Sequence, residues 1–229
     1  MESDLAQDTI LTLAILGGTG KEGSGLAFRW AHAGYAVVIG SRDAARARSA
    51  AAALNEKLGR EDLVKGMANV EAARACDIAI LTVPYSAHRA TLESVKDALK
   101  GKILVDVTVP LNPDSPRTVH LPPSGSVGVE AQTLLADQVK VVSAFQDIGF
   151  GHLQELDHAI DCDVLVTGND KDAKKQVIAL AEAIGMRAFD AGPIENAVVA
   201  EALTSALINI NVKFKVKSAG IRITGLPRR

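Results

Sequence analysis

A glycine-rich turn directly after a short apolar run constrains this chain more than any other feature. Residues Ile10–Leu16 are apolar, and the sequence GGTGKEG follows at positions 17–23, before a segment of helical composition. The spacing Gly18-x-Gly20-x-x-Gly23 between a strand and a helix predicts a dinucleotide-binding βαβ unit. Gly18 is expected to permit the tight turn, Gly20 to let the backbone approach a pyrophosphate, and Gly23 to let the helix pack on the strand. No Gly-Lys-Ser/Thr ending follows, so a Walker-type loop is excluded.

Short apolar runs alternate with longer helix-like segments along the whole chain. The expected strands are Ile10–Leu16, Tyr35–Gly40, Asp77–Val83, Lys102–Val109, Val139–Phe145, Asp163–Thr167 and Arg187–Asp190. The expected helices are Glu22–Gly34, Ala44–Leu58, His88–Leu99, Asp170–Ile184 and Pro193–Lys215. Continuous apolar strands separated by helices are typical of a parallel sheet covered on both faces. The predicted fold class is α/β, a doubly wound Rossmann fold with a mainly parallel sheet and a small C-terminal α/β annex.

No linker divides the chain, but its last third is expected to pack on the rest as a smaller unit. We predict a nucleotide-binding domain over residues 9–148 and a C-terminal, substrate-side domain over residues 149–229. Residues 110–128 hold five prolines and are expected to form a long loop. Because this loop leaves the carboxyl end of a strand, it is either a binding loop or a surface excursion.

The end of the second expected strand indicates which dinucleotide binds. NAD sites usually carry Asp or Glu there, whereas this chain has Ser41 and Arg42. A hydroxyl and a guanidinium can bind a 2′-phosphate, and Arg46 lies one helical turn later. NADP(H) is therefore favoured, with Asp43 expected to cap the next helix. The alternative is that Ser41 and Asp43 are helix caps only and that Arg42 is solvated.

Composition excludes several classes of protein. The 229 residues carry a net charge of −2 and only 3% aromatic side chains, so neither a nucleic-acid partner nor an anionic membrane surface is predicted. No apolar run reaches the roughly 18–20 residues of a membrane span. Cys76 and Cys162 lie in no metal-ligand spacing. They are expected to be buried packing groups in a reducing cytoplasm.

No side-chain pattern predicts a catalytic acid, a catalytic base or a metal site. His88 lies near the expected cofactor face and could touch a phosphate or the nicotinamide amide, but a surface position at a helix start is favoured. His152 and His158 flank Glu155 in a spacing that suits no standard zinc motif, so a solvated turn is favoured. His120 is expected to be exposed in the proline-rich segment.

Several further motifs follow the glycine turn in order. They are IGSR at 39–42, ACDIAILTVP at 75–84, VVSA at 141–144, DAGP at 190–193, EALT at 201–204 and INI at 208–210. With these motifs, nearly the whole chain resembles the NADPH-dependent reductases of the deazaflavin coenzyme F420. The resemblance implies hydride transfer between the nicotinamide of NADP(H) and F420, the co-substrate, without an obligatory catalytic side chain.

The resemblance also assigns residues to the two ligands. The implied cofactor-binding residues are Gly18, Thr19, Gly20, Lys21, Glu22, Ser41, Arg42, Arg46, Thr82, Val83, Pro84 and Ala144. The implied substrate-binding residues are Gln146, Ile148 and Pro193. The family commonly has a histidine where this chain has Gln146, and glutamine cannot carry charge. Two alternatives therefore stay open: an NADP-dependent reductase of a flavin, an imine or a metal chelate, and a non-enzymatic NADP-binding redox sensor.

The C-terminal segment is basic and contains no acidic residue. Its cations are Lys213, Lys215, Lys217, Arg222, Arg228 and Arg229. They would attract the phosphate and glutamyl tail of the deazaflavin, but a solvated tail is favoured, and a subunit contact is a third alternative. The long apolar helix before them is expected either to cap the binding cleft or to pair with a second subunit in a homodimer.

Overall fold

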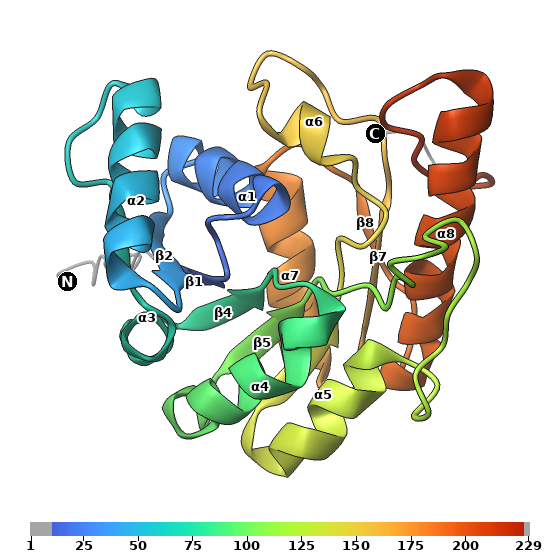
Figure 1. Cartoon of the computed structure of the whole chain (residues 1–229), viewed down its shortest axis with the longest axis horizontal. Helices are drawn as coiled ribbons and strands as arrows, with labels where there is room; N and C mark the ends of the chain where they lie inside the picture. Colours follow the sequence, from blue (N-terminus) through green and yellow to red (C-terminus); the bar gives the residue numbers. More distant parts are fainter. Residues whose placement is uncertain (1–10, 227–229) are drawn as a thin grey trace, which may run out of the picture.

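An eight-stranded sheet forms the middle layer of the molecule (Figure 1). The computed structural model describes residues 11–226. The strands are β1 (Thr12–Leu16), β2 (Ala36–Ser41), β3 (Val64–Ala68), β4 (Ile78–Leu81), β5 (Ile103–Asp106), β6 (Lys140–Ser143), β7 (Val164–Gly168) and β8 (Ala188–Asp190). Their order is β3-β2-β1-β4-β5-β6-β7-β8, and the first six run parallel. This order confirms the doubly wound fold class.

Helices cover both faces of the sheet. One face carries α1 (Lys21–His32), α2 (Ala44–Leu58) and α7 (Lys171–Ala183), and the other carries α3 (Asn69–Ala75), α4 (Tyr85–Val95) and α5 (Val127–Leu135). Successive side chains of β1 show why the strands read as unbroken apolar runs. Leu13 and Ile15 enter the first core, while Ala14 and Leu16 enter the second. Both faces of the sheet are therefore buried under helices, as in other parallel sheets.

The C-terminal part extends the same sheet with a reversed direction. β6 pairs antiparallel with β7, through the register Val142 to Gly168, and β7 pairs parallel with β8. The short helix α6 (Phe150–Leu153) lies in the connection between β6 and β7, and the chain closes with α8 (Ala197–Phe214). The predicted domain division at residue 148 therefore falls between two hydrogen-bonded strands, and it stays a prediction.

The apolar pattern does not predict β3 and α3. β3 is an edge strand whose sequence, VKGMA, includes a lysine and a glycine, so it lacks the apolar run of an interior strand. The start of α5 at Val127 also falls inside the segment expected to be a loop. Ser126 caps this helix, because its Oγ accepts a hydrogen bond from the Val129 amide at 3.1 Å.

α8 is long and apolar, and Ile194–Phe214 would suffice by length and composition to cross a membrane. Core helices of soluble proteins have the same character. Glu201 fixes α8 within this fold: it is 1% exposed and accepts hydrogen bonds from the amides at the start of α5 at 2.8 and 3.0 Å. Elsewhere along its length, α8 exposes Val199, Val212 and Phe214. The predicted pairing of two subunits through this helix stays a prediction.

Candidate active site

The glycine turn lies between β1 and β4, where the following helices leave to opposite faces of the sheet. Gly17, rather than Gly18, adopts the left-handed conformation, with φ +77°. Position 18 has no room for a side chain, because a Cβ there would lie 2.7 Å from a carbonyl oxygen of β1. A Cβ on Gly23 would lie 2.4 Å from Thr82 Oγ1, which confirms the predicted close packing of helix on sheet. Around Gly20 the nearest atom would be 3.8 Å away, leaving room for a ligand.

Asn69 holds this turn in place, and sequence reasoning did not identify it. Its side chain is 6% exposed, and its Oδ1 accepts a hydrogen bond from the Gly17 amide at 3.3 Å. A Cβ on Gly40 would approach the same Oδ1 to 2.7 Å, so the end of β2 has no room for a side chain at this position. Its signal in the sequence is weak, because Asn69 follows β3, which the apolar pattern does not show.

A cavity of about 370 Å³ opens along the turn, and we call it the cofactor cavity. It is lined by Gly17, Thr19, Gly20, Ser41, Arg42, Asp43, Arg46, Asn69, Thr82, Val83, Pro84, Ala87 and Thr91. Most of the predicted cofactor residues therefore meet in one place. The helix α1 points its free N-terminal amides toward this turn, as a pyrophosphate site requires.

The far end of the cofactor cavity has the character of a phosphate site. Ser41 is buried at the end of β2, whereas Arg42 and Arg46 are exposed, and neither guanidinium pairs with a carboxylate within residues 11–226. Asp43 is engaged by α2, because its Oδ1 accepts hydrogen bonds from the amides of Ala45 and Arg46 at 2.8 and 3.3 Å. The predicted capping role of Asp43 is confirmed, and two cations remain for an anionic ligand.

A second cavity, of about 460 Å³, adjoins the first, and we call it the acceptor cavity. The two cavities share Gly20, Thr82, Val83 and Pro84. The rest of its wall is Lys21, Glu22, Gly23, Val107, Thr108, Val109, Leu111, Gln146, Asp147, Ile148, Gly149, Phe150, Thr204, Leu207, Ile208, Asn211, Lys217 and Ala219. α8 thus lines the cleft, which is one of the two roles expected for it. Part of the proline-rich segment does so too, at Leu111.

Only some of the remaining predicted site residues line the cavity that was expected for them. Gln146 and Ile148 line the acceptor cavity, as expected, while Lys21 and Glu22 line it rather than the cofactor cavity. Gly18 lies beneath the turn, against β1. Ala144 is fully buried in the core, and Pro193 precedes the 3-10 turn Ile194–Asn196, so neither lines either cavity.

The predicted basic tail has several environments. Lys217 lines the acceptor cavity, whereas Arg222 forms an ion pair with Asp161. Arg228 and Arg229 lie outside the described residues, as do the first two residues of the predicted nucleotide-binding domain. The tail therefore contributes at least one cation to a ligand-sized space.

A strained residue directs Gln146 toward the acceptor cavity. Phe145 has φ +74°, a conformation that costs of order 1–3 kcal/mol for a residue other than glycine. Its ring packs edge-on against Trp30, with centroids 5.6 Å apart. The Gln146 Nε2 then donates hydrogen bonds to the Asp106 carbonyl at 2.9 Å and to Ser143 Oγ at 2.8 Å, while its Oε1 is buried without a partner among the described residues. A ligand or water that donates to Oε1 would satisfy it.

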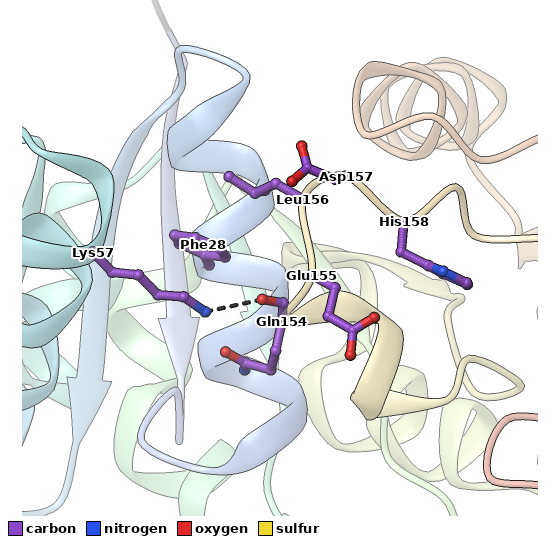
Figure 2. Close-up of a pocket in the computed structure, with 7 residues that line it drawn as sticks. All are labelled: Phe28, Lys57, Gln154, Glu155, Leu156, Asp157 and His158. Carbon is purple, nitrogen blue, oxygen red and sulfur yellow. Dashed lines mark hydrogen bonds between the residues drawn. The ribbon is translucent and has the colours of Figure 1, made fainter.

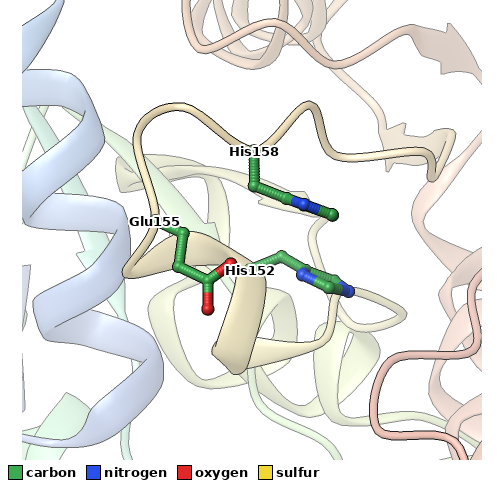
Figure 3. A group of neighbouring side chains, drawn as sticks. All are labelled: His152, Glu155 and His158. Carbon is green, nitrogen blue, oxygen red and sulfur yellow. The ribbon is translucent and has the colours of Figure 1, made fainter.

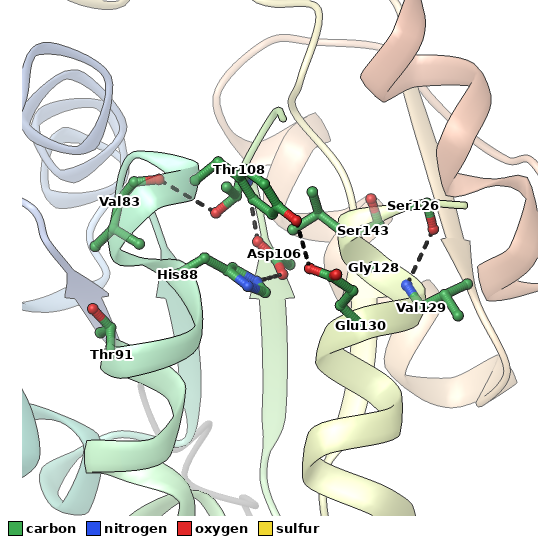
Figure 4. Close-up of polar contacts among 12 residues, drawn as sticks. Val83, His88, Thr91, Asp106, Thr108, Ser126, Gly128, Val129, Glu130 and Ser143 are labelled. Carbon is green, nitrogen blue, oxygen red and sulfur yellow. Dashed lines mark hydrogen bonds and ion pairs between the residues drawn. The ribbon is translucent and has the colours of Figure 1, made fainter. Parts of the chain in front are cut away.

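His88 lies in a buried polar network beneath the site (Figure 4). Its Nε2 is 2.7 Å from Asp106 Oδ2, and both side chains are 2% exposed, so the favoured surface position for His88 is wrong. Burial lowers the pKa of His88, but the hydrogen bond and charge of Asp106 outweigh it, and the net shift is upward. His120 is exposed and both cysteines are buried, as predicted.

Two carboxyl groups line the acceptor cavity: Asp147 is buried and Glu22 is half-buried. Burial raises the pKa of Glu22 to about 8. Burial also raises the pKa of Asp147 to about 7, although a hydrogen bond from Thr204 Oγ1 at 3.4 Å opposes this shift. Both groups can hold a proton near neutral pH.

A hollow of about 590 Å³, larger than either of these two cavities, lies elsewhere (Figure 2). It is an open surface depression lined by Phe28, Lys57 and residues 154–158. Lys57 closes one side, with its Nζ 4.1 Å from the centre of the Phe28 ring and 2.9 Å from the Gln154 carbonyl oxygen. None of the predicted site residues lines it.

Comparison with known proteins places the chain in a family. Residues 12–110 match the family described as NADP oxidoreductase, coenzyme F420-dependent. The F420-dependent NADP reductase of Methanothermobacter marburgensis is 47% identical over 95% of this chain and 100% of its own length. That of Methanocaldococcus jannaschii is 45% identical over 94% and 99%.

A solved structure from Arthrobacter sp. FB24, described as a candidate F420-dependent NADP-reductase, is also similar. It is 26% identical, and the match covers 93% of this chain and 99% of that one, with a TM-score of 0.80. The similarity therefore spans both cavities and includes the antiparallel extension of the sheet. On these matches, the chain belongs to the F420-dependent NADP reductase family.

Proposed function

We propose that this protein transfers a hydride between NADP(H) in the cofactor cavity and coenzyme F420 in the acceptor cavity. The observation that carries this proposal is the wall shared by the two cavities, formed by Gly20 and residues 82–84. Two ring systems entering from opposite sides meet there, and direct transfer needs reacting atoms about 3–3.5 Å apart. Because the two ligands carry the chemistry, the protein acts mainly by orienting them.

Charge in the two cavities supports the same pair of ligands. Ser41, Arg42 and Arg46 suit the 2′-phosphate of NADP(H). Lys21 and Lys217 line the acceptor cavity and suit the phosphate and glutamyl tail of F420. Leu207 and Ile208 of α8 give the same cavity an apolar wall for an aromatic ring.

The direct test mixes the purified protein with NADPH and oxidised F420 and follows both chromophores, with NADH as the control. We expect rapid, equimolar oxidation of NADPH and reduction of F420, and slow reaction with NADH. Tight NADPH binding without F420 turnover would instead favour a flavin, imine or metal-chelate acceptor, or a redox sensor.

Gln146 is proposed to meet the deazaflavin through its free Oε1. Changing Gln146→Leu removes this acceptor, and we expect the KM for F420 to rise about tenfold, the upper range for one neutral hydrogen bond. Gln146→His restores a ring nitrogen and should return the KM to within about threefold. Steady-state kinetics with each substrate varied in turn provide the measurement. An equal rise in the KM for NADPH would show that the change acts through the fold instead.

Asp147 is proposed to supply the proton that accompanies the hydride, since NADPH + F420 + H⁺ gives NADP⁺ + reduced F420. A carboxyl with a pKa of about 7 holds its proton below that pH, so kcat for F420 reduction should fall as pH rises through 7. Asp147→Asn should lower kcat about tenfold, because water in the cavity replaces part of the effect, and should flatten the profile. Glu22→Gln is the matched control. A flattened profile in that variant, with Asp147→Asn unchanged, would assign the proton to Glu22.

A further inference from the structure

The turn after α6 gathers three metal-ligating side chains outside the active site (Figure 3). His152 lies in α6, and Glu155 and His158 lie in the turn that follows. The two imidazole rings stack with centroids 4.0 Å apart and planes inclined by 10°. The ligand atoms of all three side chains lie within 4.8 Å of one another. The sequence favoured a solvated turn for these residues, because their spacing matches no standard zinc motif, but the turn after α6 brings their side chains together.

A buried cation from α1 fixes the backbone that carries these side chains. Arg29 is 7% exposed, and its Nη2 lies 2.6 Å from the carbonyl oxygen of His152, 2.5 Å from that of Glu155 and 2.9 Å from that of His158. Its Nε also donates to the Leu153 carbonyl at 3.3 Å. All three ligand-bearing residues are therefore tied to one guanidinium, so their Cα atoms stay close without any bound ion.

We propose that His152, Glu155 and His158 form a binding site for one divalent transition-metal ion of the zinc class. Two imidazoles and one carboxylate are a donor set that zinc uses in proteins, with water as the fourth ligand. Tetrahedral zinc with bonds of about 2.05 Å holds its ligand atoms about 3.4 Å apart. Closing from 4.8 Å needs only side-chain rotation, which is open to Glu155 and His158 because both are exposed.

The site has a structural link to the active site. The same segment supplies Gly149 and Phe150 to the wall of the acceptor cavity. Gln154, between the ligands, donates through Nε2 to the Lys21 carbonyl and to Ser24 Oγ, both at 3.2 Å, in the first turn of α1. A bound ion therefore cross-links a segment that joins the acceptor wall to the phosphate-binding helix, and it should raise the melting temperature.

The test is a calorimetric titration of the full-length, metal-free protein with Zn²⁺, together with thermal unfolding with and without the ion. We expect one ion per chain with a micromolar or tighter Kd, and an upward shift in Tm. His158→Ala and Glu155→Gln should each weaken binding at least about tenfold and abolish the Tm shift. His120→Ala, which removes an exposed histidine elsewhere, is the matched control and should bind as the wild type does.

Retained NADPH binding and an unchanged circular dichroism spectrum establish that each variant is folded. No binding by the wild-type protein overturns the proposal. So does an equal loss in His120→Ala and His158→Ala, which would mean that zinc adheres to surface histidines in general. Neither readout depends on the acceptor, so this proposal can fail while the proposed reductase function stands.

Discussion

Replacing Arg42 and Arg46 together by alanine should lower kcat/KM for NADPH by about 100- to 1000-fold and leave kcat/KM for NADH within about threefold. Both guanidiniums line the cofactor cavity next to Ser41, and neither is occupied by a carboxylate of the described chain. A hydrogen bond to a charged group contributes about 1.5–3 kcal/mol. Solvent weakens both contacts at this exposed rim, so together they contribute about 3–4 kcal/mol. This free energy corresponds to the stated change in kcat/KM.

Initial rates at saturating F420, with each nucleotide varied, measure this effect. Arg48→Ala is the matched control, since Arg48 is an exposed arginine of the same helix that does not line the cavity. A similar loss for NADPH and NADH would show that the two arginines bind a part that the nucleotides share. Equal damage from Arg48→Ala would mean that the overall charge of α2, and not a phosphate site, attracts the cofactor.

Replacing His88 by alanine should destabilise the fold by about 3–5 kcal/mol, the usual cost of removing one partner of a buried ion pair. His88 and Asp106 are almost fully buried and 2.7 Å apart, so the alanine variant leaves the Asp106 carboxylate without its main partner. The remaining contact to its other oxygen comes from the Thr108 amide at 3.0 Å. Urea unfolding at pH 6 measures the difference, and His120→Ala at an exposed position should cost almost nothing.

The stability that His88 provides should also depend on pH. Its pKa in the folded protein is raised above the ordinary value of 6.5, so folding favours the protonated ring. The stabilisation is therefore complete below pH 6.5 and is lost as pH rises through the folded pKa. The gap in unfolding free energy between wild type and His88→Ala should narrow on going from pH 6 to pH 9. A gap that widens over this range would contradict the upward shift.

More of the cofactor cavity than of the acceptor cavity could be predicted from the sequence. Gly23 can be predicted because a helix packed closely on a strand needs a residue without a side chain there. The pair Ser41–Arg42 can be predicted because a phosphate calls for particular residue types at short spacing along the chain. The burial of His88 could not be predicted, because it depends on Asp106, which belongs to a strand 18 residues away. The left-handed backbone of Phe145 could not be predicted either, because its ring packs against Trp30, far away in the sequence, and the residues next to it give no turn signal.

The same contrast holds for secondary structure. Interior strands can be predicted from their apolar sequences because both of their faces are buried; the side chains of β1, for example, enter the two cores alternately. The edge strand β3 faces solvent and tolerates a lysine and a glycine, so local sequence does not distinguish it from a loop. Ser126, by contrast, is a helix-capping signal that the proline-rich surroundings mask.

The two cavities that share Thr82–Pro84 are built from separate stretches of the polypeptide. Every residue of the cofactor cavity lies between positions 17 and 91, whereas the acceptor cavity, apart from its contacts at 20–23 and 82–84, is assembled from positions 107–219. The two cavities are thus built mostly from different parts of the chain, with Gly20 and residues 82–84 in common. Under the proposed function, substitutions within residues 107–219 can change the acceptor while the nucleotide site outside the shared wall stays intact.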